Sequence, residues 1–298
     1  MAKTRVLLCL SMVFTIAVLG ACGDVGDLVT EPSDGDRGTS RSDSSVDDDS
    51  VEAILKAGQL ALRRDVTGRF VREVTYRPER EQRSVIRQAE GKYDIEQRRA
   101  RGKATLLDAT GGDAPLPFEF ASDGRRRIVR AAGWPCWVVL DPDDTSPIAE
   151  LNPMPGSSRL PGEIAGFLLA EPTNFADVGS SDVIEVLVPL RVVVGLVSTS
   201  VYRELAGKMA AVPVQAKIHL ESGRFTSWSV RGDDLGHAVA AFGIIEDRDS
   251  DLSRVNVRVE LSDVGAMGPI RLPPRSDRVR MLPGADDLDA TACERTTV

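Results

Sequence analysis

The chain has 298 residues, enough for one or two domains with a substantial core. It contains 45 Asp and Glu against 37 Lys and Arg, and its formal net charge is −8. This acidic balance argues against a nucleic acid as the partner and against a basic patch that holds anionic lipid head groups.

Residues 1–21 have the pattern of a secretory signal peptide. Lys3 and Arg5 precede an apolar run without charges over residues 6–19. A signal-peptide core needs about 7–15 apolar residues, whereas a membrane-spanning helix needs roughly 20. The run is therefore predicted to direct export and not to span the membrane.

The end of this signal matches the bacterial lipobox, which is Leu, two small residues and Cys. The matching residues are Leu19, Gly20, Ala21 and Cys22. The match predicts cleavage before Cys22 and attachment of acyl chains such as palmitate to that residue. Two or more acyl chains anchor a protein stably, so we expect a tether to the extracytoplasmic face of the cell membrane. The alternative is a plain secretory signal in which the Cys occurs by chance.

Cysteine usage predicts one disulfide. Cys9 is removed with the signal and Cys22 is used for lipid, which leaves Cys136 and Cys293. Two thiols in an oxidising compartment are expected to pair. The alternative is one buried thiol and one free thiol near the C-terminus.

An acidic segment and a helix begin the mature chain. Residues 22–49 are rich in Asp, Ser and Gly and have few large apolar side chains, so they are predicted to be a disordered tether. Residues 50–64 predict a helix with Ser50 as its N-cap. Its apolar face is predicted to contain Val51, Ile54, Leu55 and Leu62.

The next part of the chain predicts strands. Residues 68–77 alternate, with Phe70, Val74 and Tyr76 on one side. Residues 84–107 predict two strands around a turn near Arg101 and Gly102. Asp123 and Gly124 then predict a hairpin, which is followed by a short strand at residues 137–140.

The second half mixes helices and strands. A short helix is predicted between Pro161 and Pro172. Residues 192–197 are almost entirely apolar, which predicts a strand buried on both faces. Residues 212–232 predict a hairpin that turns at Ser222 and Gly223, with Val214, Ala216, Ile218 and Leu220 facing inward. Residues 233–242 predict a short helix, and residues 255–265 a further strand.

This order of elements predicts an α+β fold, in which helices pack on one face of an antiparallel sheet. Long alternating strands in a meander are able to curl into an open barrel.

Three stretches of the second half resemble the bacterial LppX/LprG lipoprotein family and, more loosely, the LolA-like fold. They are VVVGLVSTSVYRELAG at 192–207, VPVQAKIHLESGRFTSWSV at 212–230 and VELSDVGAMGPIRLPP at 259–274. The resemblance implies a half-open, curved antiparallel sheet or barrel with helices on its concave face. It places one such domain at residues 50–276, followed by a tail at 277–298.

Catalytic chemistry has little support in the sequence. His219 is expected on the solvent face of a strand, and His237 lies beside Asp233 and Asp234. A general base is conceivable at His237, but no nucleophile motif accompanies it. No Cys and His cluster has the spacing of a metal site. We therefore expect a protein that is not an enzyme and that needs no cofactor or metal.

The resemblance implies two functions, because some members of the family hold lipid acyl chains and others with this fold bind proteins as envelope sensors. The first hypothesis is an envelope lipoprotein that binds a lipid or another apolar molecule in the half-open barrel. The alternative is a lipoprotein without a cavity, whose partner is an envelope protein. The residues predicted to line a ligand, which would otherwise fill a closed core, are Phe70, Val74, Leu168, Val193, Leu196, Ile218 and Phe242.

Overall fold

The structure of the protein is a computed structural model. It describes residues 48–77, 85–106, 116–140, 160–173, 183–198, 201–202, 212–241, 243, 251–280 and 293. In chain order the helices and strands of this part are α1 (Asp48–Arg64), β1 (Thr67–Tyr76), β2 (Val85–Asp94), β3 (Arg99–Leu106), β4 (Leu116–Ser122), β5 (Arg127–Ala131), β6 (Trp137–Leu140), α3 (Gly162–Leu168), β7 (Glu171–Pro172), β8 (Val183–Pro189), α4 (Leu190–Val197), β9 (Pro213–Glu221), β10 (Arg224–Val230), α6 (Gly232–Ala241), β11 (Val255–Ser262) and β12 (Arg278–Arg280).

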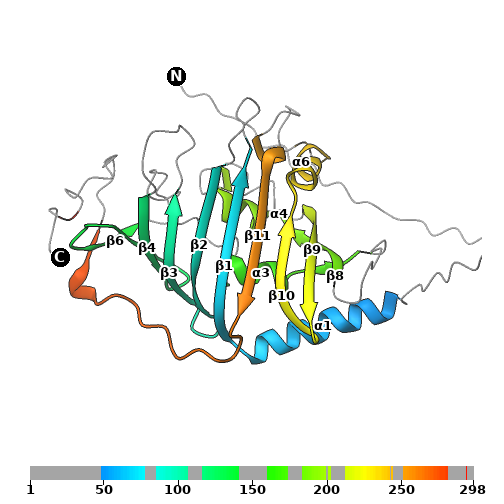
Figure 1. Ribbon diagram of the computed structural model, residues 1–298, viewed down its shortest axis with the longest axis horizontal. Helices are drawn as coiled ribbons and strands as arrows, with labels where there is room; N and C mark the ends of the chain where they lie inside the picture. Colours follow the sequence, from blue (N-terminus) through cyan, green and yellow to red (C-terminus); the bar gives the residue numbers. More distant parts are fainter. Residues whose placement is uncertain are drawn as a thin grey trace, which may run out of the picture. The chain divides into compact units, whose positions relative to one another are not determined.

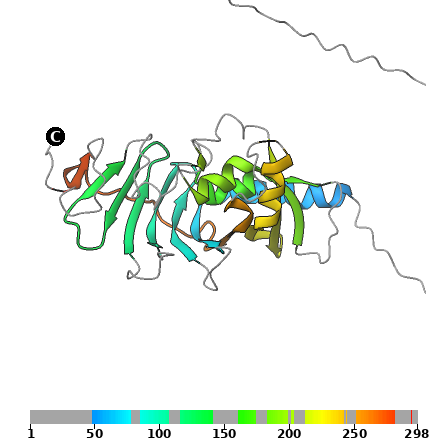
Figure 2. The ribbon, with the colours of Figure 1, turned by 90° about the horizontal axis from the view of Figure 1, so that it is seen from above.

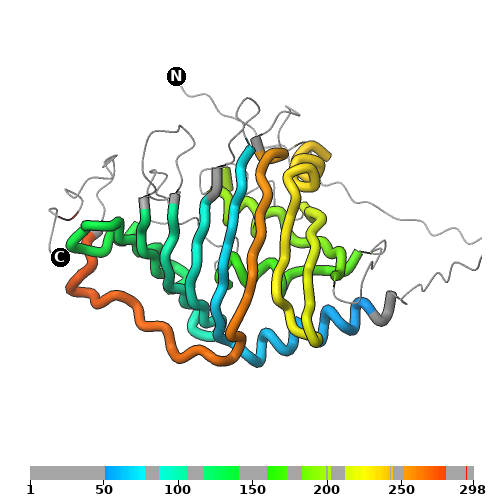
Figure 3. Tube along the Cα trace, in the orientation of Figure 1, coloured from blue at the N-terminus to red at the C-terminus, as the bar shows by residue number. Residues whose placement is uncertain are grey.

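All strands belong to one sheet, in the order β12-β6-β5-β4-β3-β2-β1-β11-β10-β9-β8-β7. Every neighbouring pair is antiparallel except β12 and β6, which are parallel. The trace shows β1 and β11, far apart in sequence, side by side in the middle of the sheet (Figure 3). The two end strands, β12 and β7, do not pair with each other, so the sheet is open. The predicted α+β class with a half-open antiparallel sheet is confirmed.

The helices cover one half of the sheet. Helices α1, α3, α4 and α6 pack against strands β7 to β11. The view from above shows these helices on one side of the sheet, while β3 to β6 extend beyond them (Figures 1 and 2). We call the face of the sheet that bears the helices the inner face, and the opposite face the outer face.

The alternation of the strands decides which side chains face the core. Strands β9 and β11 alternate buried and exposed residues along their length. The inward residues predicted for the hairpin, Val214, Ala216, Ile218 and Leu220, are all buried. In β1, Phe70 and Val74 are buried and Tyr76 packs against the core as predicted. Burial of such apolar side chains is the main stabilising term of the fold.

Helix α1 approaches the sheet closely at one glycine. A Cβ atom at Gly58 would lie 2.7 Å from Cζ of Phe225 in β10. The next residue, Gln59, donates from Nε2 to the carbonyl oxygens of Phe167, at 3.1 Å, and Ala170, at 2.9 Å. The small residue allows close packing, and the amide joins α1 to the end of α3.

A pair of glycines lies between two aromatic rings on the inner face. Gly91 of β2 is directly opposite Gly102 of β3. In the same row, Phe70 of β1 lies opposite Gly91, and Phe120 of β4 lies opposite Gly102. The ring centroids of Phe70 and Phe120 are 6.2 Å apart, so the rings cover the glycines. A Cβ atom at Gly102 would lie 2.0 Å from the carbonyl oxygen of Glu90. No larger residue fits there without movement of the backbone.

We therefore expect Gly102→Ala to destabilise the fold by about 1–3 kcal/mol, the range seen for overpacked cores. The substitution should lower the midpoint of urea unfolding. Gly268→Ala is the control, because a Cβ atom at Gly268 meets no atom within 4 Å. Equal midpoints for the two variants would contradict this account of the glycine pair.

Four local predictions are wrong. The turn between β2 and β3 lies at residues 95–98 and not near Gly102. In this turn the backbone N–H of Gln97 donates to the side chain of Asp94, and Arg98 has a φ of 56°. Pro172 does not end α3, because the helix stops at Leu168 and Pro172 belongs to β7. In α1, Ser50 lies within the helix and Ile54 is 39% exposed.

The largest correction concerns residues 192–197, which form most of α4 and not a strand. Strand β8 ends at Pro189, whose ψ of 127° is extended, and the helix begins at the next residue. A run that is buried on every side has no periodicity to separate a strand from a helix. Its valines favour a strand locally, but packing in the helical layer decides the outcome.

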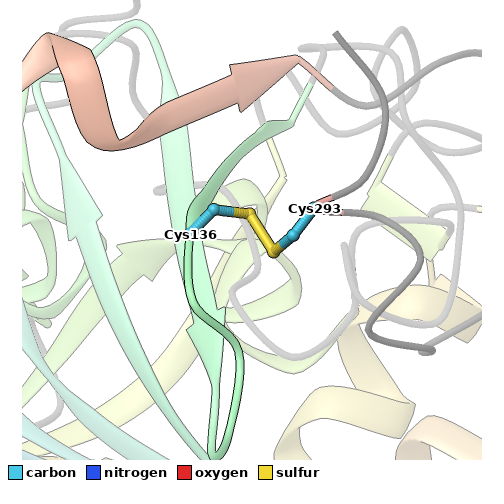
Figure 4. Close-up of a disulfide and its surroundings, with 2 residues drawn as sticks. All are labelled: Cys136 and Cys293. Carbon is cyan, nitrogen blue, oxygen red and sulfur yellow. A yellow bond between two sulfur atoms is a disulfide. The ribbon is translucent and has the colours of Figure 1, made fainter. Parts of the chain in front are cut away.

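A disulfide joins Cys136 and Cys293, as the cysteine count predicted (Figure 4). Cys136 is buried and directly precedes β6, the strand beside which β12 lies in parallel. The bond therefore holds the C-terminal part of the chain at the same edge of the sheet as β12.

Candidate functional site

The residues predicted to line a ligand lie at the interface between the sheet and the helices. Strands β1 and β9 contribute three of them, and helices α3 and α4 contribute three more. All six are buried members of one apolar cluster: Phe70, Val74, Leu168, Val193, Leu196 and Ile218. The seventh, Phe242, lies outside the described residues. The structure brings the six to one interface, and their contact with a ligand stays a prediction.

The interface beneath α3 is filled by aromatic side chains. The ring centroid of Phe167 is 5.2 Å from that of Phe225 and 6.4 Å from that of Trp228. Trp228 is fully buried, and its Nε1 donates to the carbonyl oxygen of Glu163 at 2.9 Å. A Cβ atom at Gly166 would lie 2.3 Å from the indole. This part of the interface has no room for a ligand.

Two charged side chains of the sheet reach into the same interface. Nη1 of Arg72 lies 3.4 Å from Oε1 of Glu163, with only 8% and 10% of the two side chains exposed. Arg87 donates from Nη1 to the carbonyl oxygen of Val197 at 3.1 Å, at the end of α4. Burial lowers the pKa of the Arg72 guanidinium, and the nearby Glu163 carboxylate partly opposes this shift.

This ion pair was not predicted from the sequence, although β1 carries the signal for it. Arg72 stands between the inward residues Phe70 and Val74, so the alternation places its charge inside. A buried charge needs a partner, and a search for a carboxylate in an otherwise apolar helix leads to Glu163 of α3.

Apart from Arg87 of β2 and the buried Arg127 of β5, the inner face of β2 to β6 is largely apolar. Strands β3 to β6 lie beyond the strands on which the described helices pack. The apolar side chains of this face come from all five strands and are buried: Ala89, Tyr93, Ala100, Ala104, Phe118, Phe120, Val129, Val138 and Leu140. The hydroxyl of Tyr93 has no hydrogen-bond partner among the described residues. Burial raises the pKa of this hydroxyl, and the nearby Asp65 adds to the shift.

Two pockets lie on the outer face. The first, of about 470 Å³, is bordered by polar residues that include Gln88, Glu119 and Arg130. The second, of about 590 Å³, is bordered by β1, β2, β3 and the segment after β11. Of the residues predicted to line a ligand, only Phe70 borders either pocket.

Both histidines of the chain are exposed to solvent. His219 is exposed on β9, as predicted, and His237 is exposed on α6. Within the described ranges there is no group of three or more His, Cys, Asp and Glu residues placed to hold a metal ion.

The predicted signal, the lipobox with Cys22 and most of the predicted tether lie outside the described residues. Among the residues that the structure does describe, no helix is both long and apolar enough to cross a membrane.

Comparison with known proteins gives similarity to solved structures only. No protein-family model and no curated protein matches the chain. The crystal structure of Mycobacterium tuberculosis lipoprotein LppX has a TM-score of 0.40 and 13% identity, and the match covers 75% of this chain and 100% of LppX. That of LprF from Mycobacterium bovis has a TM-score of 0.39 and 14% identity, over 76% of this chain and 97% of LprF. LppX, one of the proteins that give the predicted family its name, is thus among the structures to which this chain is similar.

Proposed function

We propose that the protein is a lipid-anchored envelope lipoprotein that shelters an apolar ligand, such as a lipid, in its half-open sheet. The observation that carries the proposal is the largely apolar inner face of β2 to β6, which continues past the strands on which the described helices pack. These side chains are buried in the structure, so an acyl chain would take the place of the protein atoms that cover them. Each Å² of the acyl chain that is removed from water would contribute roughly 25 cal/mol. The lipobox at Cys22 supports the anchor.

The filled interface beneath α3 supports a ligand position toward β2 to β6. Of the predicted lining residues, Phe70 is the nearest to this region, because its ring packs against Phe120 of β4. Leu168 belongs to α3 and Ile218 to β9, so both are expected to support the site from the helix-covered half.

Mass spectrometry of molecules that co-purify with the chain beginning at Gly23 tests the proposal. We expect a lipid or another apolar molecule in stoichiometric amount. Val129→Phe, on β5 beyond the described helices, should then lose the ligand and cost less stability than overpacking a closed core, because the ring would occupy the space of the ligand. Val214→Phe is the matched control on β9 under the helices, where overpacking should cost about 1–3 kcal/mol.

Equal destabilisation by Val129→Phe and Val214→Phe, together with no lipid from the wild type, would favour the second candidate function. This candidate is a protein-interaction lipoprotein without a ligand cavity. The packing of Phe167, Phe225 and Trp228 favours it, because it shows that part of the layer between sheet and helices is closed.

Replacing the predicted anchor residue tests the membrane attachment separately. We expect Cys22→Ala to abolish incorporation of labelled palmitate and to prevent normal processing, because the lipobox thiol that accepts the lipid is lost. Cys9→Ala is the control and should be processed like the wild type. Normal maturation and membrane retention of Cys22→Ala would contradict the lipobox.

A further inference from the structure

A row of like charges crosses the outer face of the sheet. Arg69 of β1 lies directly opposite Lys92 of β2, and Lys92 lies directly opposite Arg101 of β3. Side chains in such positions have Cβ atoms about 4.5–5.5 Å apart, and like charges there are destabilising. The neighbouring row differs, because it places Glu90 opposite Lys103. The row of three cations therefore works against stability unless an anion joins it.

These cations line the larger of the two outer-face pockets. Its volume is about 590 Å³, and Lys103 and Arg271 line it as well. One wall is the segment of residues 266–274, which we call the strap. Figure 1 shows this part of the chain, in orange, running from the end of β11 toward β12. Nη1 of Arg101 donates to the carbonyl oxygen of Arg271 at 2.9 Å, which fixes the strap beside the row of cations.

Little of this positive charge is neutralised by the protein. Arg69 pairs with Asp263 at 2.9 Å. Arg101 lies over the ring of Trp137, 5.5 Å from its centroid, a contact that orients the guanidinium and leaves its charge. The remaining cations of the pocket, Lys92, Lys103 and Arg271, form no ion pair with another described residue.

The pocket lining therefore has five cations and the single carboxylate of Glu90, in a chain whose net charge is −8. The net charge of the whole chain does not reveal this cluster, because the five cations come together only through the register of three strands and the position of the strap.

We propose that this pocket binds a phosphate group. A planar guanidinium donates two parallel hydrogen bonds to phosphate oxygens, and lysine ammonium groups add point charges, so the pair of residue types suits this anion. The volume is within the range of small-molecule sites and exceeds what phosphate alone fills, so the ligand is a phosphate ester. The pocket lies on the face of the sheet opposite the proposed apolar site, although Phe70 borders the pocket as well.

Titration calorimetry of the full-length protein tests the proposal with three probes, namely inorganic phosphate, glycerol 3-phosphate and a monomeric short-chain phosphatidic acid. We expect the esters to bind, with affinity that falls as salt is added. Lys92→Gln should weaken binding about tenfold, the loss expected for one charge-assisted hydrogen bond. Lys56→Gln, at an exposed position of α1, removes the same charge elsewhere and should bind like the wild type.

The preferred probe identifies the source of the phosphate. Tighter binding of phosphatidic acid than of glycerol 3-phosphate supports a lipid head group, and equal binding supports a soluble ester. No binding of any probe to the wild type, or equal affinities for Lys92→Gln and Lys56→Gln, would overturn the proposal.

Thermal melting is a second measurement. Substitution of a solvated surface lysine outside the pocket should not change how the melting temperature responds to ligand. Without ligand, Lys92→Gln should melt at or above the wild-type temperature, because the variant relieves repulsion within the row. Glycerol 3-phosphate should raise the melting temperature of the wild type and of Lys56→Gln but not that of Lys92→Gln. An equal rise for all three proteins contradicts a site at Lys92.

Discussion

Replacing both disulfide cysteines, as Cys136→Ser with Cys293→Ser, is expected to lower the free energy of unfolding by about 2–5 kcal/mol, the range for removal of a native disulfide. The bonded residues are 157 positions apart in the sequence. In the chain-entropy model, closing so long a loop restricts the unfolded chain by about 5 kcal/mol. Urea unfolding of the wild type and the double variant measures the difference.

The loss should be largest at one edge of the sheet. Strand β12 pairs only with β6, and Cys136 directly precedes β6. Without the bond, amide hydrogens of β12 should exchange faster than those of β9 and β10, which lie in the helix-covered half. A region with few packed neighbours opens locally at a lower free energy than the core, so its amide hydrogens exchange faster.

Chemical reduction is the control for the serine substitutions. Treating the wild type with a reductant should lower its unfolding midpoint to that of the double variant and should leave the variant unchanged. Peptide mapping without reduction should recover Cys136 and Cys293 in one linked product. Two free thiols in protein isolated from the envelope, or equal midpoints before and after reduction, would contradict the bond.

The sequence predicted the elements whose pattern is local. The hairpin of β9 and β10 combined strict alternation with a turn at Ser222 and Gly223, and both residues adopt positive φ values, of 51° and 73°. Helix α6 was predicted within one residue of its observed bounds, Gly232–Ala241. In each case the pattern of side chains alone separates buried from exposed positions.

The wrong predictions concern segments whose structure is decided by packing between residues far apart in the sequence. Helix α4 is buried on nearly all sides, so its sequence has no polar face to reveal the helical period. Gly102 looked like a turn residue, but it lies within β3, where a Cβ atom would meet the carbonyl oxygen of Glu90 in β2. That requirement depends on the pairing of β2 with β3, which the sequence does not specify locally.

The candidate sites divide in the same way. Counting cysteines was sufficient for the pair Cys136 and Cys293, because the alternatives were few. The six described residues predicted to line a ligand were found in one buried cluster. Inward alternation identifies the three in β1 and β9, and apolar character alone identifies the three in α3 and α4. The cations of the outer-face pocket were not predicted, because Arg69, Lys92 and Arg101 become neighbours only through strand register.

The buried ion pair gives the second large expected effect. Arg72→Met should lower the free energy of unfolding by about 3–5 kcal/mol, because it leaves the carboxylate of Glu163 buried without its partner. Only 10% of that side chain is exposed, so water replaces little of the lost interaction. Glu163→Met should have a similar cost, since it isolates the guanidinium of Arg72 instead.

Replacing both partners should cost much less than the sum of the single changes, because no uncompensated charge then remains in the interface. A double-mutant cycle with Arg72→Met and Glu163→Met, measured by urea unfolding, isolates this coupling. The matched control is the exposed pair of Arg258 and Glu260, which are 2.8 Å apart with 63% and 48% of their side chains exposed. Arg258→Met should cost at most about 1 kcal/mol, because solvent screens an exposed pair. If Arg72→Met costs no more than Arg258→Met, the pair does not hold α3 against the sheet.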